Sequence, residues 1–369
     1  MQPKAEGLHL RHWRADDIDT VYRACQDPAI QRWTGVPSPY LPEHAREYVT
    51  AVAPAGWQDG TSAHFAVTDA QTDELLGSCG LPSIDRVRRS AEVGYWVAPW
   101  ARGRGVATRA TRAVSRWAFD ELGMKRVIWQ AEIGNHASRL VARRAGFRIE
   151  GYLRLADAGQ EAWVGSLLPG DPTEVDVPEL EEQRAAIFGA PQPRLRCGPQ
   201  PRLDGILRAP DERDIDAMVA ACRDPETVRW TTVPNPYERR HAEDFALRVT
   251  AAKWARGDGV VYAITDPHDA WVGSIDLSLA PTDPYAGEVG FLVAPESRGR
   301  GYAVAALRAL AEWGFDELGL ARIVWKAHVG NVASRRVAEK AGFTIEGTLR
   351  GDLNHRGERK DAWVGGLTR

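Results

Sequence analysis

The clearest hydrophobic pattern in the chain runs from Val93 to Ala98, where apolar residues fill both faces of an extended segment. Such a run is typical of a strand that is covered on both sides, and Pro99 ends it. A tight turn of glycines and arginines follows, and the residues after it predict a helix that begins at about Arg104. The rest of the chain is arranged around this unit of strand, turn and helix.

The turn has the composition of an anion-binding loop. Glycine lets the backbone approach a ligand closely, because no Cβ stands in the way. At the start of the helix, free N–H groups and the positive end of the helix dipole point at one spot. This geometry suits a phosphate or pyrophosphate, and the two arginines add positive charge. The residues concerned are Arg102, Gly103, Arg104, Gly105, Val106 and Ala107.

The same unit occurs a second time. The stretch 288–303 lies 196 residues after 92–107, and 11 of the 16 positions are identical. Farther along, 126–151 matches 322–347 at 16 of 26 positions. A repeat of this length is far too long for a solenoid and indicates two whole domains of one fold. The second loop and helix start are Arg298, Gly299, Arg300, Gly301, Tyr302 and Ala303.

The repeat divides the chain into three parts. Residues 1–168 form a first domain, here named lobe one, and residues 205–369 form a second, lobe two. Residues 169–204 are rich in proline and charge, which indicates a linker, and one short helix is expected within it at 178–188. The sequence leaves open whether this helix docks on a lobe.

Both lobes show the same predicted order of elements. A short strand comes first, followed by two helices joined by a proline-rich turn, two strands, the central unit, a strand with a short helix, and two closing strands. We expect first strands at 8–11 and 206–208, second helices at 43–52 and 238–255, strand pairs at 64–68 with 75–81 and at 261–265 with 271–279, and strands after the unit at 126–131 and 322–327.

Composition excludes several classes of protein. The 369 residues carry a formal net charge of −3, so neither nucleic acid nor an acidic membrane is an expected partner. No run of about 18 apolar residues predicts a membrane-spanning helix, and no apolar segment at the N-terminus resembles a signal peptide. The four cysteines form no CxxC pair, which indicates neither a metal site nor a disulfide framework and favours a reducing cytoplasm. Cys25 and Cys222 match in the repeat and are expected to be small buried residues.

A second motif follows the central unit in each lobe. Asn135 and Ser138 stand in Gly-Asn-His-Ala-Ser, Asn331 and Ser334 stand in Gly-Asn-Val-Ala-Ser, and Ala-Gly-Phe follows in both lobes. Together with the Arg-x-x-Gly-x-Ala loops and the Glu-Val-Gly strands, this order resembles the GNAT N-acetyltransferases. Within that family it is similar to the branch that acetylates ribosomal-protein N-termini and many small amines. The resemblance implies an α/β fold of two tandem domains, each with a mixed, mostly antiparallel twisted sheet flanked by helices.

The resemblance also implies that acetyl-CoA is the cosubstrate and that no metal is needed. The glycine–arginine loops would hold the pyrophosphate, and Asn135 and Asn331 would hydrogen-bond the pantetheine arm. The backbone near Val97 and Val293 would run beside that arm and direct an N–H at the thioester carbonyl.

Acyl transfer to an amine further requires a proton acceptor for the amine and a proton for the leaving thiolate. The resemblance assigns the first role to Glu92 and Glu288 and the second role to Ser138 and Ser334. Simpler alternatives exist for each residue type. Asparagine is a good helix N-cap, serine is common in a first helical turn, and a glutamate on a strand can pair with a neighbouring arginine.

Several aromatic residues stand outside these motifs. The matched pairs Trp33 with Trp230 and Trp57 with Trp254 are expected mainly in the core or between the lobes, with a minority lining a substrate pocket. His136 has no histidine counterpart in lobe two, so a solvent-facing imidazole is expected there.

The two lobes differ most in the closing hairpin, which is longer and more polar at 350–361 than at 154–161. In the GNAT family this hairpin often forms part of the wall of the acceptor site. We therefore hypothesise that lobe two catalyses and that lobe one binds CoA with weak or no turnover. Two fused lobes can mimic the dimer of single-lobe relatives, so a monomer is favoured.

The favoured function is acetyl-CoA-dependent N-acetylation of a primary amine on a small molecule, such as an antibiotic, an amino sugar or a peptide-like compound. Two alternatives stay open. One is acetylation of a protein N-terminal α-amine, and the other is an acyl-CoA-binding module in which one or both lobes are inactive.

Overall fold

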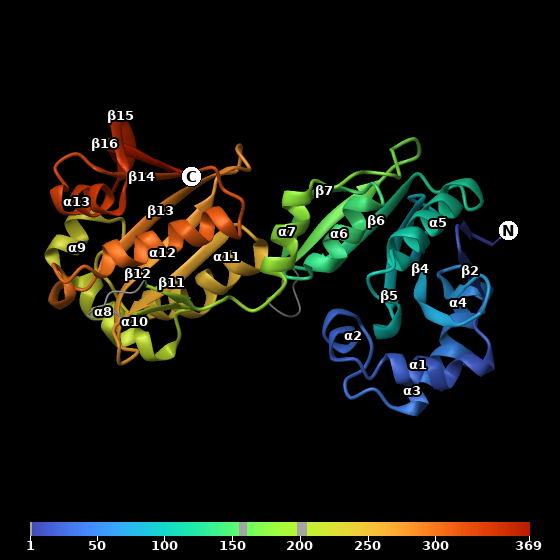
Figure 1. Cartoon of the computed structure of the whole chain (residues 1–369). Coiled ribbons are helices and arrows are strands. Elements are labelled where there is room, and N and C mark those ends of the chain that lie inside the picture. Colours follow the sequence, from blue (N-terminus) through green and yellow to red (C-terminus); the bar gives the residue numbers. More distant parts are fainter. Residues whose placement is uncertain (1, 155–160, 198–204) are drawn as a thin grey trace. The chain divides into compact units, whose positions relative to one another are not determined.

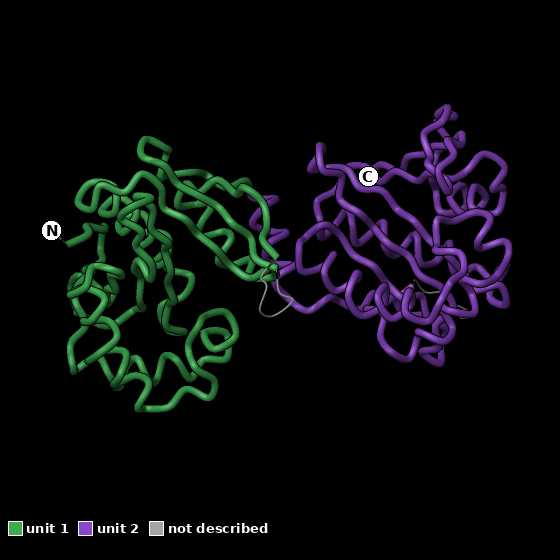
Figure 2. Tube along the Cα trace, turned by 180° about the vertical axis from the view of Figure 1, so that it is seen from behind, with its two compact units in different colours: residues 1–178 green, residues 179–369 purple. Residues whose placement is uncertain are grey.

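The computed structural model describes residues 2–154, 161–197 and 205–369. The chain divides into two compact units, residues 1–178 and 179–369, and each unit is built on its own eight-stranded sheet (Figures 1 and 2). None of the helices in the described part of the chain is both long enough and apolar enough to span a bilayer.

Apart from the helix α7 that begins the second unit, the helices and strands occur in the same order in both units. The first unit contains β1 (Lys4–Ala5), β2 (Leu8–Arg11), α1 (Ile18–Ala24), α2 (Pro28–Trp33), α3 (Pro42–Glu47), α4 (Ala53–Asp59), β3 (Ala63–Asp69), β4 (Leu75–Asp85), β5 (Ser90–Val97), α5 (Val106–Asp120), β6 (Arg126–Glu132), α6 (His136–Arg144), β7 (Arg148–Arg154) and β8 (Glu161–Leu167). The second unit contains α7 (Glu179–Phe188), β9 (Leu195–Arg196), β10 (Ile206–Arg208), α8 (Ile215–Arg223), α9 (Pro225–Trp230), α10 (Arg239–Glu243), α11 (Thr250–Arg256), β11 (Gly259–Thr265), β12 (Trp271–Leu279), β13 (Ala286–Val293), α12 (Tyr302–Asp316), β14 (Arg322–His328), α13 (Val332–Ala341), β15 (Thr344–His355) and β16 (Glu358–Thr368).

The two sheets have the same topology. The strand orders are β1-β2-β3-β4-β5-β6-β8-β7 and β9-β10-β11-β12-β13-β14-β16-β15. In each sheet one central pair, β5 with β6 or β13 with β14, is parallel, and the other described pairs are antiparallel. The predicted fold class is therefore confirmed.

The helix of each central unit packs its apolar side on the sheet. In the first unit α5 buries Val106, Ala110, Val114 and Trp117, a spacing that places them on one face of a helix. They join a core around Trp129, and α12 repeats the arrangement around Trp325. The tight packing of this helix fixes where its N-terminus lies relative to the strand before it.

Two expected helix boundaries change. The central helices begin at Val106 and Tyr302 rather than near the preceding arginine, because Gly105 and Gly301 adopt left-handed conformations with φ of 69° and 93°. The helical segment expected at 43–52 continues through the π-helical turn Tyr48–Val52 to Asp59.

The helix expected between the lobes, α7, packs within the second unit. Phe188 lies against Trp254 with ring centroids 4.8 Å apart. The Arg184 guanidinium donates to the backbone oxygens of Leu318 at 2.8 and 2.9 Å and of Pro284 at 2.6 Å. These contacts attach part of the expected linker to lobe two.

Burial of individual side chains gives one correction. His136 is only 3% exposed and packs edge-on against Trp163 at 5.1 Å, so the expected solvent-facing imidazole is wrong. Cys25 and Cys222 are buried, as expected, and so are the other two cysteines. Trp57 and Trp254 pack in the two cores, also as expected.

Candidate active site

The central parallel pair of strands separates halfway along its length. In lobe two, β13 pairs with β14 only from Ala286 to Val289, opposite Arg322 to Trp325. In lobe one, β5 pairs with β6 only from Ser90 to Val93. Beyond these points each first strand remains bonded to its antiparallel neighbour alone, so its other edge opens into a gap.

The backbone at this open edge directs N–H groups away from the antiparallel neighbour strand. Ala294 N–H donates to the carbonyl of Val272 at 2.9 Å, toward β12. Because N–H directions alternate along a strand, the N–H of Val293 points to the opposite edge, where β14 has separated. Ala98 donates to Leu76 at 2.9 Å and sets the same direction for Val97 in lobe one. The N–H groups of both valines thus point toward the open edge.

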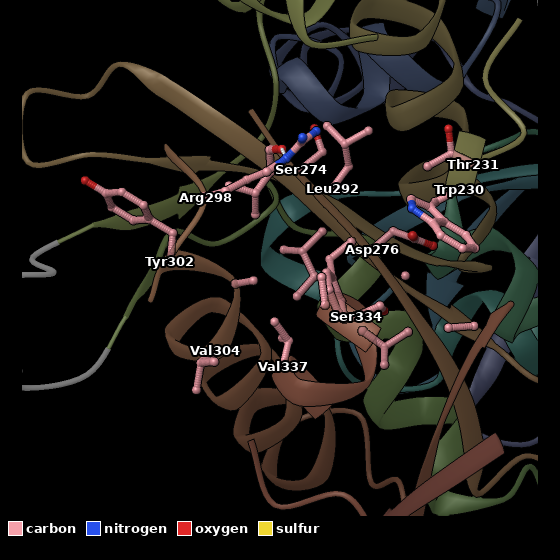
Figure 3. Close-up of a pocket in the computed structure, with 18 of the residues that line it drawn as sticks. Trp230, Thr231, Ser274, Asp276, Leu292, Arg298, Tyr302, Val304, Ser334 and Val337 are labelled. Carbon is pink, nitrogen blue, oxygen red and sulfur yellow. Dashed lines mark hydrogen bonds between the residues drawn. The ribbon is translucent and has the colours of Figure 1, made fainter. Parts of the chain in front are cut away.

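A cavity of about 1360 Å³ occupies the gap in lobe two (Figure 3). Its walls come from the separated ends of β13 and β14, from β12, and from the helices α9, α12 and α13. Arg298, Gly299, Gly301, Tyr302, Ala303, Val293, Asn331 and Ser334 all line it. The structure thus brings most of the cosubstrate residues expected in lobe two around one space.

The glycine–arginine loops have the same backbone in both lobes. Gly103 and Gly299 have φ of 74° and 76°, and Gly105 and Gly301 are also left-handed. Neither α5 nor α12 has a side-chain cap at its N-terminus. The first N–H groups of these helices therefore lack a side-chain acceptor, which is the arrangement that binds a phosphate.

The first arginine of each loop forms an ion pair with an aspartate at the start of a neighbouring helix. Arg102 Nη2 lies 2.6 Å from Asp27 Oδ1, and Arg298 Nη2 lies 2.8 Å from Asp224 Oδ2. The hydrogen bond from Arg102 lowers the pKa of Asp27 below its usual value. These arginines connect the loops to α2 and α9, while Arg300 is exposed at the loop surface.

The Asn of the second motif takes the capping role considered for it in both lobes. Asn135 and Asn331 cap α6 and α13, since their Oδ1 atoms accept from Ser138 N and Ser334 N at 3.1 Å. In each lobe the serine hydroxyl accepts from a core tryptophan at 3.1 Å. The capping bond holds the serine backbone and the indole holds the serine hydroxyl, and in lobe two Ser334 lines the cavity.

The two serine sites differ in one neighbour. In lobe one the Tyr95 hydroxyl lies 3.0 Å from Ser138 Oγ and donates to the Ser138 carbonyl at 3.1 Å. Phe291 occupies the matching position in lobe two and lines the cavity. The Ser334 hydroxyl is therefore not shared with a tyrosine.

The two strand glutamates also lie in different surroundings. Glu92 is half-buried, and this burial raises the pKa of its carboxyl. The side chain of Glu288 is 53% exposed and has Lys326 Nζ at 3.7 Å. Among the described residues that line the lobe-two cavity, Glu288 is not included.

Three further side chains line this cavity. Trp230 on α9 was considered from the sequence as a pocket residue, whereas Asp276 on β12 and His328 on β14 were not identified. The last two break the repeat, because lobe one has Gly80 and Glu132 in their places. Glu132 forms an ion pair with Arg32 in lobe one. The tip of the lobe-one hairpin, residues 155–160, lies outside the described residues.

The chain matches a family model described as an acetyltransferase (GNAT) domain, once at residues 7–148 and once at residues 205–344. The two matches together take in most of both lobes.

Curated relatives match shorter parts of the chain. A protein of Bacillus subtilis (strain 168) named "Putative ribosomal N-acetyltransferase YdaF" is 44% identical over 80 residues, which are 22% of this chain and 44% of that protein. The chain thus spans less than half of that relative's length. A ribosomal-protein-serine acetyltransferase of Escherichia coli (strain K12) is 30% identical over 91 residues, 25% of this chain and 51% of that protein. The spermidine N(1)-acetyltransferase of the same strain is 26% identical over 153 residues, 41% of this chain and 78% of that protein.

Solved structures match about one lobe each. A GNAT-family acetyltransferase from Bacillus anthracis has 22% identity and a TM-score of 0.39, covering 44% of this chain and 94% of that chain. Mycobacterium smegmatis RimJ in complex with CoA-disulfide has 22% identity and a TM-score of 0.42, covering 48% of this chain and 86% of that chain.

Proposed function

This chain belongs to the GNAT acetyltransferase family, and on that basis we propose that lobe two transfers an acetyl group from acetyl-CoA to the primary amine of a small molecule. The observation that carries this proposal is the cavity between the separated ends of β13 and β14. It combines an uncapped helix N-terminus, a free strand edge and the Ser334 hydroxyl.

The fit to acetyl-CoA is supported at both ends of that molecule. The loop from Gly299 to Gly301 and the first N–H groups of α12 would bind the pyrophosphate, with Arg300 nearby. Asn331 would accept or donate along the pantetheine arm while its Oδ1 caps α13. Acetyl-CoA supplies the acetyl group as an activated thioester.

The chain's own residues account for two steps of the transfer. The N–H of Val293 would stabilise negative charge on the thioester oxygen as the amine attacks. The indole N–H of Trp325 donates to Ser334 Oγ, so this oxygen accepts from the indole while its own proton can point elsewhere. Ser334 Oγ would give that proton to the departing sulfur. Glu288 stays the candidate proton acceptor for the amine in lobe two, directly or through water, and Glu92 and Ser138 stay the candidates in lobe one.

For lobe one we propose CoA binding with weak or no turnover. Its loop keeps both left-handed glycines, which supports binding. Its Ser138 hydroxyl is engaged by Tyr95, and Glu132 pairs with Arg32 where lobe two has His328. The first difference engages the hydroxyl expected to protonate the leaving thiolate, and the second engages the side chain at the position of His328.

A calorimetric titration with acetyl-CoA tests this assignment through a matched pair of variants. Gly105→Glu and Gly301→Glu each place a negative charge and a side chain where the pyrophosphate would lie. We expect two equivalents for the full-length protein and the loss of one in each variant. Loss of turnover only in Gly301→Glu would support lobe two as the catalyst, whereas loss only in Gly105→Glu would reverse the assignment. No acetyl-CoA binding at all would overturn the proposed activity.

A protein N-terminal α-amine is the second candidate acceptor, since two of the relatives described above have ribosomal names. A spermidine acetyltransferase among the relatives favours the small-molecule acceptor. Acetylation of a peptide with a free N-terminal serine, but of no small amine, would favour the protein substrate. We further propose a cytoplasmic monomer, supported by four free buried cysteines and by the presence of two fused lobes in one chain.

A further inference from the structure

An aspartate that interrupts the repeat lies in the wall of the lobe-two cavity. Asp276 stands on β12 directly opposite Gly290 of β13. Its Oδ1 lies 2.8 Å from the position that a Cβ on residue 290 would occupy. Figure 3 shows Asp276 and Trp230 among the side chains gathered around the same cavity. The glycine thus leaves room for the carboxylate against the strand.

The position of Asp276 along the strand relates it to the cosubstrate gap. The parallel pairing of β13 with β14 ends at Val289, so Gly290 is the first residue of β13 at the open edge. Glu288 lies two residues earlier, where the strands are still paired. Since a strand rises about 3.3 Å per residue, Asp276 is roughly 7 Å nearer to the open part of the gap than Glu288.

The carboxylate is held in one orientation by two donors. Lys253 Nζ lies 2.8 Å from Asp276 Oδ2, and Ser278 Oγ donates to the same oxygen at 3.2 Å. Lys253 also donates to Ser278 Oγ at 2.7 Å, which closes a small network. Both donors reach Oδ2, while Oδ1 lies over Gly290, and the side chain is 37% exposed. This arrangement presents one oxygen to a ligand.

Lobe one lacks all three members of this network. The register of its sheet pairs Gly80 with Gly94, so a glycine replaces the aspartate. Gly56 and Pro82 stand where lobe two has Lys253 and Ser278. The network is therefore a feature of one lobe, although the surrounding strands are shared by both.

We propose that Asp276 is a specificity-determining residue that binds a second, charged ammonium group of the acceptor, so that lobe two acts on diamines or larger polycationic amines. This inference rests on the proposed function of lobe two. The reacting amine must lose its proton to attack, and the donor expected for the thioester oxygen is Val293, three residues beyond Gly290. Three residues of strand span about 10 Å. A carboxylate at that distance from the reacting nitrogen can contact only a different part of the acceptor. An aromatic ring such as that of Trp230 is also favourable beside a cation.

The test compares two probes on the full-length protein. 1,4-Diaminobutane carries a second ammonium, whereas butan-1-amine offers the same reacting group without it. Calorimetric affinities are measured for the wild type, for Asp276→Asn, and for Asp258→Asn, an exposed aspartate of the same lobe that serves as the control. We expect the wild type and the control to prefer the diamine roughly tenfold or more, and Asp276→Asn to bind both probes alike. Acetyl-CoA affinity should be the same in all three proteins. A variant that had lost its fold would also lose this affinity, so the measurement separates a local effect from general unfolding.

The outcomes separate this inference from the proposed function. No preference for the diamine in the wild type, or a preference that survives in Asp276→Asn, overturns the role of Asp276. If Glu288→Gln alone removes the preference, the ammonium site belongs to Glu288 and the proposal is likewise overturned. Release of free CoA thiol is measured in parallel. If diamine binding depends on Asp276 but no CoA thiol is released, the proposed acetyl transfer is overturned and the ammonium site is kept. If the diamine is acetylated but its binding does not depend on Asp276, the acetyl transfer is kept and the ammonium site is overturned.

Discussion

Replacement of Phe188 tests whether α7 is part of the folding unit of lobe two. Phe188 is 3% exposed and packs against Trp254. The Trp254 indole N–H in turn donates to the carbonyl of Ala190 at 3.0 Å, just past the helix. Phe188→Ala would leave a cavity between α7 and the core that the neighbouring side chains can fill only in part.

The expected magnitude follows from this burial. A buried Phe→Ala change costs about 3–5 kcal/mol, because lost transfer free energy and an unfilled cavity add together. In a domain of 150 to 250 residues each kcal/mol lowers the melting temperature by about 2–4 °C. We therefore expect the unfolding temperature of lobe two to fall by about 6–20 °C, a large share of the stability of an ordinary domain.

Hydrogen exchange during a thermal ramp resolves the two lobes in the intact chain. Peptides from α12 should exchange at a lower temperature in Phe188→Ala, while peptides from α5 should keep their wild-type temperature. Ala186→Lys, an exposed change on the same helix, should shift neither. A shift below about 3 °C for α12 would refute the reasoning, since α7 would then lie outside the cooperative unit of lobe two.

Three further predictions concern lobe one, the helix caps and the cysteines. Burial lowers the pKa of His64, so the folded state binds its proton less readily than the unfolded chain, and lobe one should lose stability as the pH falls through about 6.5. His64→Gln should flatten this dependence of the urea midpoint between pH 7.5 and 5, and equal slopes would contradict the assignment. Asp224→Ala removes the N-cap of α9 and the partner of Arg298, so the free energy of unfolding of lobe two, measured in urea, should fall by about 1–2 kcal/mol. Asp27→Ala should have an equal effect on lobe one. An unchanged urea midpoint would argue against the stabilising role of the cap. Burial raises the pKa of Cys25 to about 11, and a thiol reagent at pH 8 should label none of the four cysteines before denaturation; rapid labelling of any would show an accessible thiol.

Much of the fold could be predicted because its signals are local. The strand from Val93 to Val97, the left-handed glycines of the loops and the capping asparagines depend on neighbouring residues, and each takes the same form in both lobes. Because the two lobes repeat one pattern, each local signal occurs in both of them. The first central helix began two residues late because Gly105 adopts a left-handed conformation, and the helical segment expected at 43–52 extended to Asp59.

Burial of single side chains was harder to predict. His136 begins a helix in a polar stretch of sequence, yet Trp163 from a strand distant in the sequence covers its ring. The docking of α7 depends in the same way on Trp254 and on carbonyl groups at the end of α12. No pattern within the helix itself specifies such partners.

The sequence by itself determined that the chain holds two GNAT domains and where their glycine–arginine loops, Asn331 and Ser334 stand, since these features follow from residue type and spacing. Only the tertiary structure decided which carboxylate faces the lobe-two cavity. Glu288 lies on the paired part of β13 and is largely exposed, whereas the register of β12 places Asp276 at the point where the strands separate. The physical reason is that register and strand separation arise from hydrogen bonds between segments far apart in the chain, and these bonds determine the face and the depth at which each side chain lies.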